Sequence, residues 1–190
     1  MKTDRIKWNQ RYDAEGMYLG QRPSPFLSRE IKRILRLAPG KRALDIACGE
    51  GRNSIFLAQQ GFLVTALDIS EVGLDKAATW AGQEGLQIDF QQADLEGYRI
   101  TERFDLIVNF NFLLRDLIPE ELRALSPGGL LIIDTIMESP HLSAAHNPAY
   151  LLQAGELRRI CEELEGEILF YEELPGDETP TARVLFRKSA

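Results

Sequence analysis

The segment 41–68, KRALDIACGEGRNSIFLAQQGFLVTALD, decides the fold of this chain. It opens with a short apolar run, Ala43 to Ala47, that stops at a turn of small residues. An amphipathic segment with the apolar residues 55–58 follows, and a second apolar run, Phe62 to Leu67, ends in Asp68. This pattern predicts a strand, a tight turn, a helix and a second strand, which together form a βαβ unit.

The turn contains two glycines, and an acid stands at the tip of the second strand. Gly49 and Gly51 let the backbone bend sharply and let a ligand come close, because no Cβ blocks it. In a doubly wound sheet, the carboxylate of Asp68 at the end of its strand can accept both hydroxyls of a ribose. An ordinary βαβ turn without a ligand is the alternative, but glycines and a strand-end acid inside one complete unit favour nucleoside binding.

The residues of the turn separate two kinds of nucleoside site. A dinucleotide fingerprint has the form G-x-G-x-x-G, and its third glycine position holds Ser54 here. The pattern present, Asp45-x-Ala47-x-Gly49-x-Gly51, resembles motif I of the class I S-adenosylmethionine-dependent methyltransferases, whose usual form is acid-x-G-x-G-x-G. Ala47 replaces the first glycine, where a small side chain is sufficient. The string DIACGEGRNS is similar to the tellurite-resistance-type and related small bacterial methyltransferases.

This resemblance implies S-adenosyl-L-methionine (SAM) as the cofactor and S-adenosyl-L-homocysteine as the product. Asp68 would hold the ribose, and Asp94 would accept from the adenine amino group, unless Asp94 only caps the next segment. The turn from Ala47 to Gly51 would pass the methionine part, with Asp45 and Asn53 supporting its ammonium or carboxylate. The cofactor-binding residues expected on this basis are Asp45, Ala47, Cys48, Gly49, Gly51, Asn53, Asp68, Ile69, Ser70, Asp94, Leu95, Asn109 and Phe110.

Asn109 and Phe110 enter this set because their strand ends beside the glycine turn, where strand order reverses and ligands bind. They are expected to line the methyl-transfer pocket, and a core role for Phe110 or Phe112 is the alternative. DNA amino-methyltransferases carry an acid or Asn followed by Pro-Pro and an aromatic residue here. This chain lacks those prolines.

Periodicity and breakers predict the remaining elements. Helices are expected over 25–38, 70–82, 113–125 and 155–164, and strands over 86–92, 104–110, 130–135, 168–174 and 183–186, with a firm break at 126–129. The last two strands should form an antiparallel hairpin at one sheet edge, whereas a Rossmann dehydrogenase would have a parallel sixth strand. The expected fold is therefore α/β, a Rossmann-like doubly wound seven-stranded sheet of order 3-2-1-4-5-7-6 with the last strand antiparallel.

The chain is expected to form a single domain over 1–190, with 1–23 as an arm or lid and 24–190 as the core. Trp8 and Tyr12 stand four residues apart, so they share a face if this piece is helical. The resemblance implies that this aromatic arm, which includes Tyr18, covers the cofactor and acceptor pocket. Aromatic faces suit a sulfonium through cation–π attraction. The alternative is that these rings only anchor the arm.

The segment 138–150 is irregular and contains both histidines, His141 and His146. A loop of this size often forms one wall of a site. His146 is a candidate general base, since its pKa ordinarily lies near neutrality, and a solvated loop histidine is the alternative. The substrate-side candidates are Trp8, Tyr12, Tyr18, Phe112, His146 and Tyr150. No acid–base pair stands out, so no catalytic residue is assigned, which is consistent with a soft or anionic acceptor.

Composition narrows the function classes. Two cysteines, Cys48 and Cys161, make no disulfide framework and no metal spacing, and no apolar run approaches a membrane span. The net charge of −7 disfavours a large nucleic-acid footprint. Residues 1–42 carry 11 Lys and Arg against 4 Asp and Glu, and this basic segment either attracts an anionic substrate or packs on the acidic remainder. The polar N-terminus lacks the apolar core of a signal peptide, so a cytoplasmic location is expected.

Two functions of different classes follow. The first is a SAM-dependent methyltransferase acting on a small molecule, such as a thiol, an oxyanion, a chalcogen or a metabolite. The second is a SAM- or nucleoside-binding regulatory module without turnover, which the missing catalytic pair suggests. A nicotinamide-dependent reductase is disfavoured by Ser54 and by the terminal hairpin.

Overall fold

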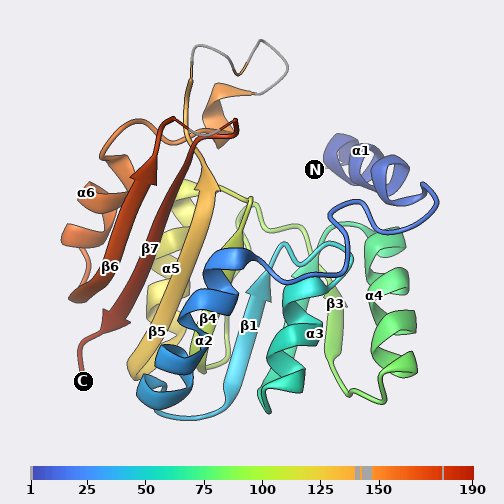
Figure 1. The fold of residues 1–190 in the computed structure, drawn as a ribbon, viewed down its shortest axis with the longest axis horizontal. Helices are drawn as coiled ribbons and strands as arrows, with labels where there is room; N and C mark the ends of the chain where they lie inside the picture. Colours follow the sequence, from blue (N-terminus) through green and yellow to red (C-terminus); the bar gives the residue numbers. More distant parts are fainter. Residues whose placement is uncertain (1, 140–141, 143–146, 177) are drawn as a thin grey trace.

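A computed structural model describes residues 2–139, 142, 147–176 and 178–190 (Figure 1). A seven-stranded sheet runs through its centre in the order β3-β2-β1-β4-β5-β7-β6. β7 is antiparallel to both of its neighbours, and the other pairs from β3 to β5 are parallel. The predicted sheet, including its order and its reversed strand, is confirmed. The strands are β1 Arg42–Ile46, β2 Leu63–Asp68, β3 Asp89–Gln92, β4 Phe104–Phe110, β5 Leu125–Ile136, β6 Gly166–Leu174 and β7 Thr181–Lys188.

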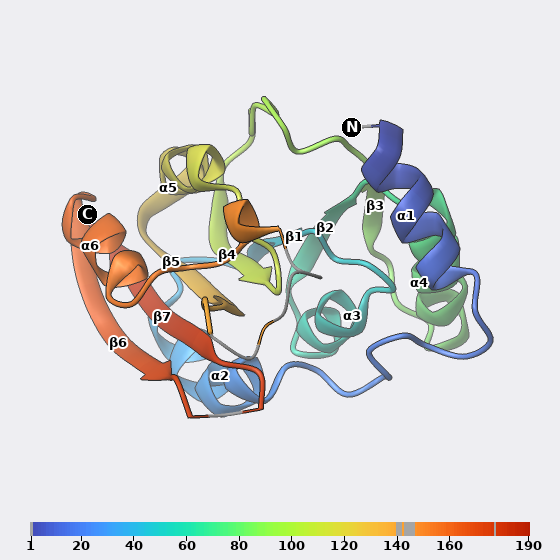
Figure 2. The same cartoon turned by 90° about the horizontal axis from the view of Figure 1, so that it is seen from above.

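Helices cover both faces of the sheet (Figures 1 and 2). One apolar cluster joins one face to α2 and α3, and a second joins the opposite face to α5 and α6. α4 packs beside α3 against β2 and β3, and α1 lies on α4 at the end of the sheet where the parallel strands finish. The helices are α1 Lys2–Tyr12, α2 Pro25–Leu37, α3 Arg52–Gln59, α4 Glu71–Gln83, α5 Ile118–Ala124 and α6 Glu156–Glu162, with 3-10 turns η1 Arg115–Leu117 and η2 Pro148–Tyr150.

Local chemistry explains where the helices around the site begin. α2 starts with Pro25, whose missing N–H is not needed in the first turn. α3 starts directly after Gly51, whose φ of 83° is unfavourable for other residues. α4 is capped by Ser70, whose hydroxyl oxygen accepts from the Gly73 N–H at 3.1 Å. Two of these three starts lie at the glycine turn or at the tip of β2.

Several predicted boundaries are wrong. The strand expected over 86–92 begins only at Asp89. The helix expected over 113–125 forms only from Arg115, first as a 3-10 turn and then as α5 from Ile118. The break expected at 126–129 lies inside β5, which starts at Leu125. The β4–β5 register shifts there, so the extra residues bulge out of the ladder. Gly128 has a φ of 74°, and a Cβ on Gly129 would lie 2.9 Å from the Ser126 carbonyl oxygen.

None of the helices in the described part of the chain is long and apolar enough to cross a membrane.

Candidate functional site

The glycine turn lies at the C-terminal end of β1. Ala47, Gly49 and Gly51 all have positive φ, at 53°, 56° and 83°. Cys48 is held in the turn because its N–H donates to the Leu67 carbonyl of β2 at 2.9 Å. Ala47 thus adopts a conformation that glycine takes at no cost, which explains why the related motif has glycine at this position.

Asp68 ties this turn to β2. Its Oδ2 accepts from the Gly49 N–H at 2.7 Å, and its Oδ1 accepts from the Ser70 N–H at 2.8 Å. Burial raises the pKa of this carboxyl, while the hydrogen bonds from Ser70 and Gly49 act against the rise. Each oxygen of a carboxylate has room for a further hydrogen bond. The structure thus brings Asp68 and the turn together, and the ribose role of Asp68 stays a prediction.

The acid in β1 and the residues after the turn make internal contacts. Ser54, which occupies the third glycine position of a dinucleotide fingerprint, donates its hydroxyl to Asp45 Oδ2 at 2.5 Å. Asp45 is 1% exposed, and burial raises its pKa to about 7. Asn53 Oδ1 accepts from the Ser24 N–H at 2.9 Å, at the start of α2. These oxygens therefore stabilise the turn, and contacts of Asp45 and Asn53 with a methionine group stay predictions.

A backbone hydrogen bond brings the segment that contains Asp94 next to Asp68. The Ala93 N–H donates to the Asp68 carbonyl at 2.9 Å, so Asp94 follows directly after the residue bonded to the ribose candidate. The Asp94 side chain is exposed, and its Oδ1 accepts from the Glu96 N–H at 3.2 Å. Leu95 is 6% exposed and belongs to the core on the α5 face. The two acids thus stand at neighbouring strand ends, as a nucleoside site requires.

The aromatic arm lies directly on the glycine turn. Trp8 and Tyr12 stack at 5.5 Å, which confirms that they share a helical face, and Tyr18 meets the edge of Tyr12 at 6.2 Å. Tyr12 is 6% exposed, and a Cβ on Gly49 would lie 2.6 Å from the Tyr12 hydroxyl oxygen. Burial and the nearby carboxylate of Asp68 raise the pKa of Tyr12 well above its ordinary value. The arm therefore covers the predicted cofactor site.

Polar contacts hold the arm in this place. Glu50 of the turn accepts from the Tyr18 N–H at 2.6 Å and pairs with Lys76 of α4 at 3.1 Å. Lys76 also donates to the carbonyl oxygens of Ala14 and Gly16, at 2.7 and 2.8 Å. The turn and α4 thus bind the arm together, although the sequence did not predict these roles for Glu50 and Lys76.

Ser70 links the arm to β2. Besides capping α4, its hydroxyl donates to Asn9 Oδ1 of α1 at 2.7 Å. The neighbouring Ile69 is half-buried, and its carbonyl accepts from Gln92 of β3 at 3.1 Å. Both residues therefore lie beside Asp68, where the sequence placed them.

The basic first segment pairs with acids of the body. Arg5 lies 3.9 Å from Glu71, Arg29 lies 3.5 Å from Glu172, and Arg42 pairs with Glu102. Of the two interpretations of this segment, packing on the acidic remainder is the one that these ion pairs support.

At the end of β4, the aromatic side chains turn inward. Phe110 is 7% exposed and belongs to the core on the α2 face, and Phe112 packs against the opposite core. Asn109 is 2% exposed, and its Nδ2 donates to Glu121 Oε1 at 2.8 Å. Asn111 has a φ of 56°. Both aromatic side chains thus pack against the core, and a place for either of them in the methyl-transfer pocket stays a prediction.

Tyr150 is the last residue of η2, and its side chain lies near Asp4 of the arm. Burial raises the pKa of its hydroxyl, and the carboxylates of Asp4, Glu96 and Asp94 raise it further. These acids belong to α1 and to the segment after β3, so Tyr150 lies near both. The other loop candidate, His146, lies outside the described residues.

Arg115 fixes η2 in this position, and the sequence did not predict its role. Its guanidinium makes a two-pronged contact with Glu156, at 2.5 and 3.0 Å, and donates to the carbonyl oxygens of Ala149 and Leu151 at 2.6 and 2.8 Å. The sequence signal that could have indicated this role is the position of Arg115, a charged residue inside the apolar stretch that follows β4. Such forked contacts stabilise more than single ones.

We expect Arg115→Ala to destabilise the protein by about 1–3 kcal/mol, because two carbonyls and a half-buried carboxylate lose their donor. Arg158→Ala, which breaks an exposed pair with Glu162 on α6, is the matched control and should cost less than about 1 kcal/mol. Chemical unfolding of both variants measures the difference. Equal losses would show that Arg115 holds nothing in place.

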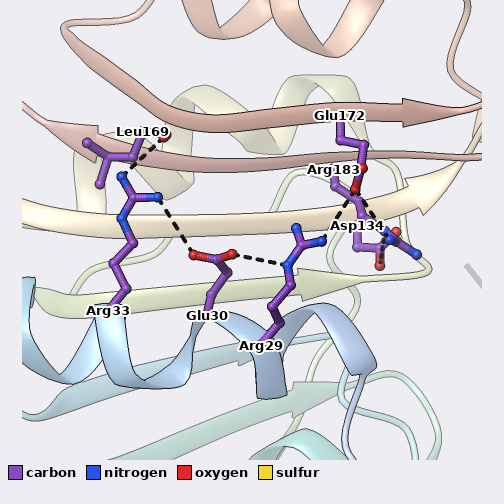
Figure 3. A network of polar contacts seen from close by, with 7 residues as sticks. All are labelled: Arg29, Glu30, Arg33, Asp134, Leu169, Glu172 and Arg183. Carbon is purple, nitrogen blue, oxygen red and sulfur yellow. Dashed lines mark hydrogen bonds and ion pairs between the residues drawn. The ribbon is translucent and has the colours of Figure 1, made fainter.

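A second network of polar contacts joins α2 to β5, β6 and β7 (Figure 3). Arg183 of β7 donates to Asp134 Oδ2 at 3.1 Å and lies 3.6 Å from Glu172, which Arg29 of α2 approaches to 3.5 Å. Burial raises the pKa of Asp134, which lies near the end of β5. Arg52, the residue after Gly51, faces both Asp134 and Asp45. This network therefore links α2, the helix that follows the arm, to the end of β5. Its members are Arg29, Glu30, Arg33, Asp134, Leu169, Glu172 and Arg183.

The sheet order, the positive-φ turn and the strand-end acids define a Rossmann-like protein of the nucleoside-cofactor class. The sheet order is that of the class I S-adenosylmethionine-dependent methyltransferases, and the comparisons with known proteins support this assignment, with SAM as the cofactor. Residues 43–129 match the family model described as a methyltransferase domain.

Three relatives illustrate this placement. The ubiquinone biosynthesis O-methyltransferase of Nitrosococcus oceani is 34% identical over 151 residues, which are 75% of this chain and 64% of that protein. TehB from Haemophilus influenzae has a TM-score of 0.73 at 22% identity, over 97% of this chain and 67% of that one. The N-methyltransferase NodS from Bradyrhizobium japonicum, in complex with S-adenosyl-L-homocysteine, has a TM-score of 0.73 at 18% identity, over 98% of both chains. This chain spans 64% and 41% of its first two curated relatives, so less than two thirds of their length.

Proposed function

We propose that this protein transfers a methyl group from SAM to a small-molecule acceptor. The observation that carries the proposal is Asp68, held at the tip of β2 by the N–H groups of Gly49 and Ser70, with exposed Asp94 at the next strand end. Two acids at this spacing offer acceptors to a ribose and to an adenine amino group. The relative named for ubiquinone O-methylation supports a small-molecule acceptor.

The residues present fit an adenosyl sulfonium. Ala47 and Gly49 take the glycine-like conformation that leaves the turn backbone accessible, and Trp8 and Tyr12 bring aromatic faces over it. When bound, SAM supplies a methyl group on a sulfonium, which is a good leaving group. The chain itself must hold the acceptor in line and close, at roughly 3–3.5 Å. No proton transfer by a side chain is needed for an acceptor that arrives already deprotonated.

We propose that residues 1–23 act as a lid on a single domain formed by 24–190. Asp68 is 5% exposed beneath α1, so a ribose reaches its oxygens only when the arm moves. The contacts of Lys76 and Glu50 with the arm would then break on entry and form again on closure. Product release would depend on the same movement.

The acceptor side of the site carries negative charge. Asp4, Asp94 and Glu96 lie near Tyr150, and together they would repel an anionic acceptor. Within the proposed small-molecule class, this surrounding favours neutral acceptors, such as a thiol or a phenol. Such an acceptor must lose its proton to solvent or to a nearby carboxylate as the methyl group is transferred.

Calorimetric titration with SAM and with S-adenosyl-L-homocysteine tests the cofactor, and nicotinamide dinucleotide serves as the control ligand. Labelled SAM with a panel of thiols, phenols and oxyanions tests the transfer. Label found on any acceptor above the enzyme-free background supports an enzyme. Tight binding without transfer would instead support the regulatory module. Absence of SAM binding would exclude both the enzyme and the regulatory module.

A further inference from the structure

A buried acid and a buried amide form an isolated pair beneath the end of β4. Glu121 of α5 is 0% exposed and Asn109 is 2% exposed, and one hydrogen bond of 2.8 Å joins Asn109 Nδ2 to Glu121 Oε1. The other oxygens of the pair, Asn109 Oδ1 and Glu121 Oε2, are buried and have no hydrogen-bond partner among the described residues. Two buried acceptors without donors are costly, and they belong to the same two side chains.

A single proton on the Glu121 carboxyl would give both unpaired oxygens a hydrogen-bond partner. A neutral carboxylic acid has one donor and one acceptor, as the terminal amide of asparagine does. With a proton on Glu121 Oε2, the acid can donate to Asn109 Oδ1 while it accepts from Asn109 Nδ2. The two side chains then satisfy each other, whereas an ionised Glu121 leaves both oxygens without a donor.

No cation in the described part of the chain compensates a charge on Glu121. The groups that face it are the amide of Asn109 from β4 and the thiol of Cys161 from α6. Its neighbour Glu120 pairs with Arg99 and Arg123. Burial accordingly raises the pKa of Glu121 to about 7, and the hydrogen bond from Asn109 only partly opposes this rise.

Asn109 lies near the C-terminal end of β4, between β1 and β5 in the sheet. It pairs with Ile46, the last residue of β1, and with Ile133 of β5. The chain then bends at Asn111, whose N–H donates to the Asp134 carbonyl at 2.8 Å. The amide of Asn109 therefore fixes the backbone at the point where β4 enters the site, between the glycine turn and Asp134.

We propose that Glu121 is an uncharged positioning residue that holds Asn109, and with it the site end of β4, through two complementary hydrogen bonds. Loss of its proton at alkaline pH breaks one of them and loosens this end of the strand. The effect on the site rests on the proposed function, whereas the acid–amide pair itself does not.

Glu121→Gln tests the pair, because an amide keeps both hydrogen bonds at every pH. The folded state holds the Glu121 proton from the ordinary pKa of 4.5 up to about 7, so stability from this group is complete below 4.5 and is lost as pH rises through 7. Between pH 5 and 8.5, the folding constant of the wild type should fall about a hundredfold more than that of the variant. Asp45 titrates in both proteins, so its contribution cancels.

Glu121→Leu is the matched disruptive variant, because it leaves the Asn109 amide without a partner. It should be at least about tenfold less stable than Glu121→Gln at pH 5. An equal pH dependence in the wild type and Glu121→Gln would overturn the proposal. So would a Glu121→Gln protein that is much less stable than the wild type at pH 5, since Glu121 would then be ionised in the fold.

Titration with S-adenosyl-L-homocysteine at pH 6 and 8.5 tests the positioning role. Wild-type affinity should fall several-fold at the higher pH, and Glu121→Gln should keep its affinity. The same fall in affinity in both proteins would overturn the positioning role of Glu121. The unfolding experiment would still decide whether the acid–amide pair exists. No binding by either protein at any pH would defeat the proposed function, and an acid–amide pair shown by unfolding would still stand.

Discussion

Replacing Asp68 by alanine is expected to weaken SAM binding by about 1.5–3 kcal/mol, the usual contribution of hydrogen bonds to a charged group. This corresponds to a loss of affinity of roughly tenfold to more than a hundredfold. The carboxylate would offer acceptors to the ribose, and it also holds the N–H groups of Gly49 and Ser70. Removing it therefore deprives the ligand of a partner and leaves two buried donors unsatisfied. Calorimetry on the folded variant measures the loss.

Asp89→Ala is the control for this substitution. Asp89 is an exposed carboxylate on β3, the strand that pairs with β2, and it makes no contact with the glycine turn. Its removal changes the net charge by the same amount and should leave the affinity within about twofold. Unchanged SAM affinity in Asp68→Ala would exclude Asp68 from the site, and the proposed function would lose its main support.

Replacing Gly73 by alanine should destabilise the protein by about 1–3 kcal/mol and release the arm. A Cβ at this position would lie 2.9 Å from Tyr12 Cδ2 and 3.1 Å from the Gly49 carbonyl oxygen. Neither contact is tolerable without movement, so α1 and the glycine turn must both shift. Chemical unfolding measures the loss of stability, and the rate of tryptic cleavage within residues 1–23 measures the release of the arm.

Gly82→Ala on the same helix is the matched control. A Cβ at Gly82 meets nothing within 4 Å, and its φ lies outside the positive range. Alanine there should stabilise α4 by about 0.5–1 kcal/mol, because glycine loses more conformational freedom on folding. If both variants behave alike, the close approach of Tyr12 to α4 is not maintained in solution.

Much of the fold could be predicted from the sequence because its signals are local. The apolar runs before the glycine turn and before Asp68, and the hairpin at the end, each depend on neighbouring residues and turn chemistry. Parallel pairing of strands joined by helices then leaves few possible sheet orders. The break expected at 126–129 failed because pairing with β4 keeps Leu125 in the sheet, and a shift of the β4–β5 register accommodates the residues between Leu125 and Leu130.

The site was predictable only in part. The positions of Gly49, Asp68 and Asp94 follow from strand ends, and the structure brings them together. The hydrogen bond between Asn109 and Glu121 could not be predicted from the sequence, because an acid in a short amphipathic helix ordinarily faces water. The contact between them crosses from β4 to α5, and its cause is the burial of both side chains.

By itself, then, the amino-acid sequence determined the backbone of the proposed cofactor site, which is a tight turn that needs small residues with acids at the tips of neighbouring strands. Tertiary structure alone decided which side chains close over that turn and which support it from below. Tyr12 reaches Gly49, Arg115 reaches Glu156 and Asn109 reaches Glu121. The reason is physical, since backbone conformation responds to nearest neighbours, whereas burial and hydrogen bonding between distant residues exist only once the sheet has assembled.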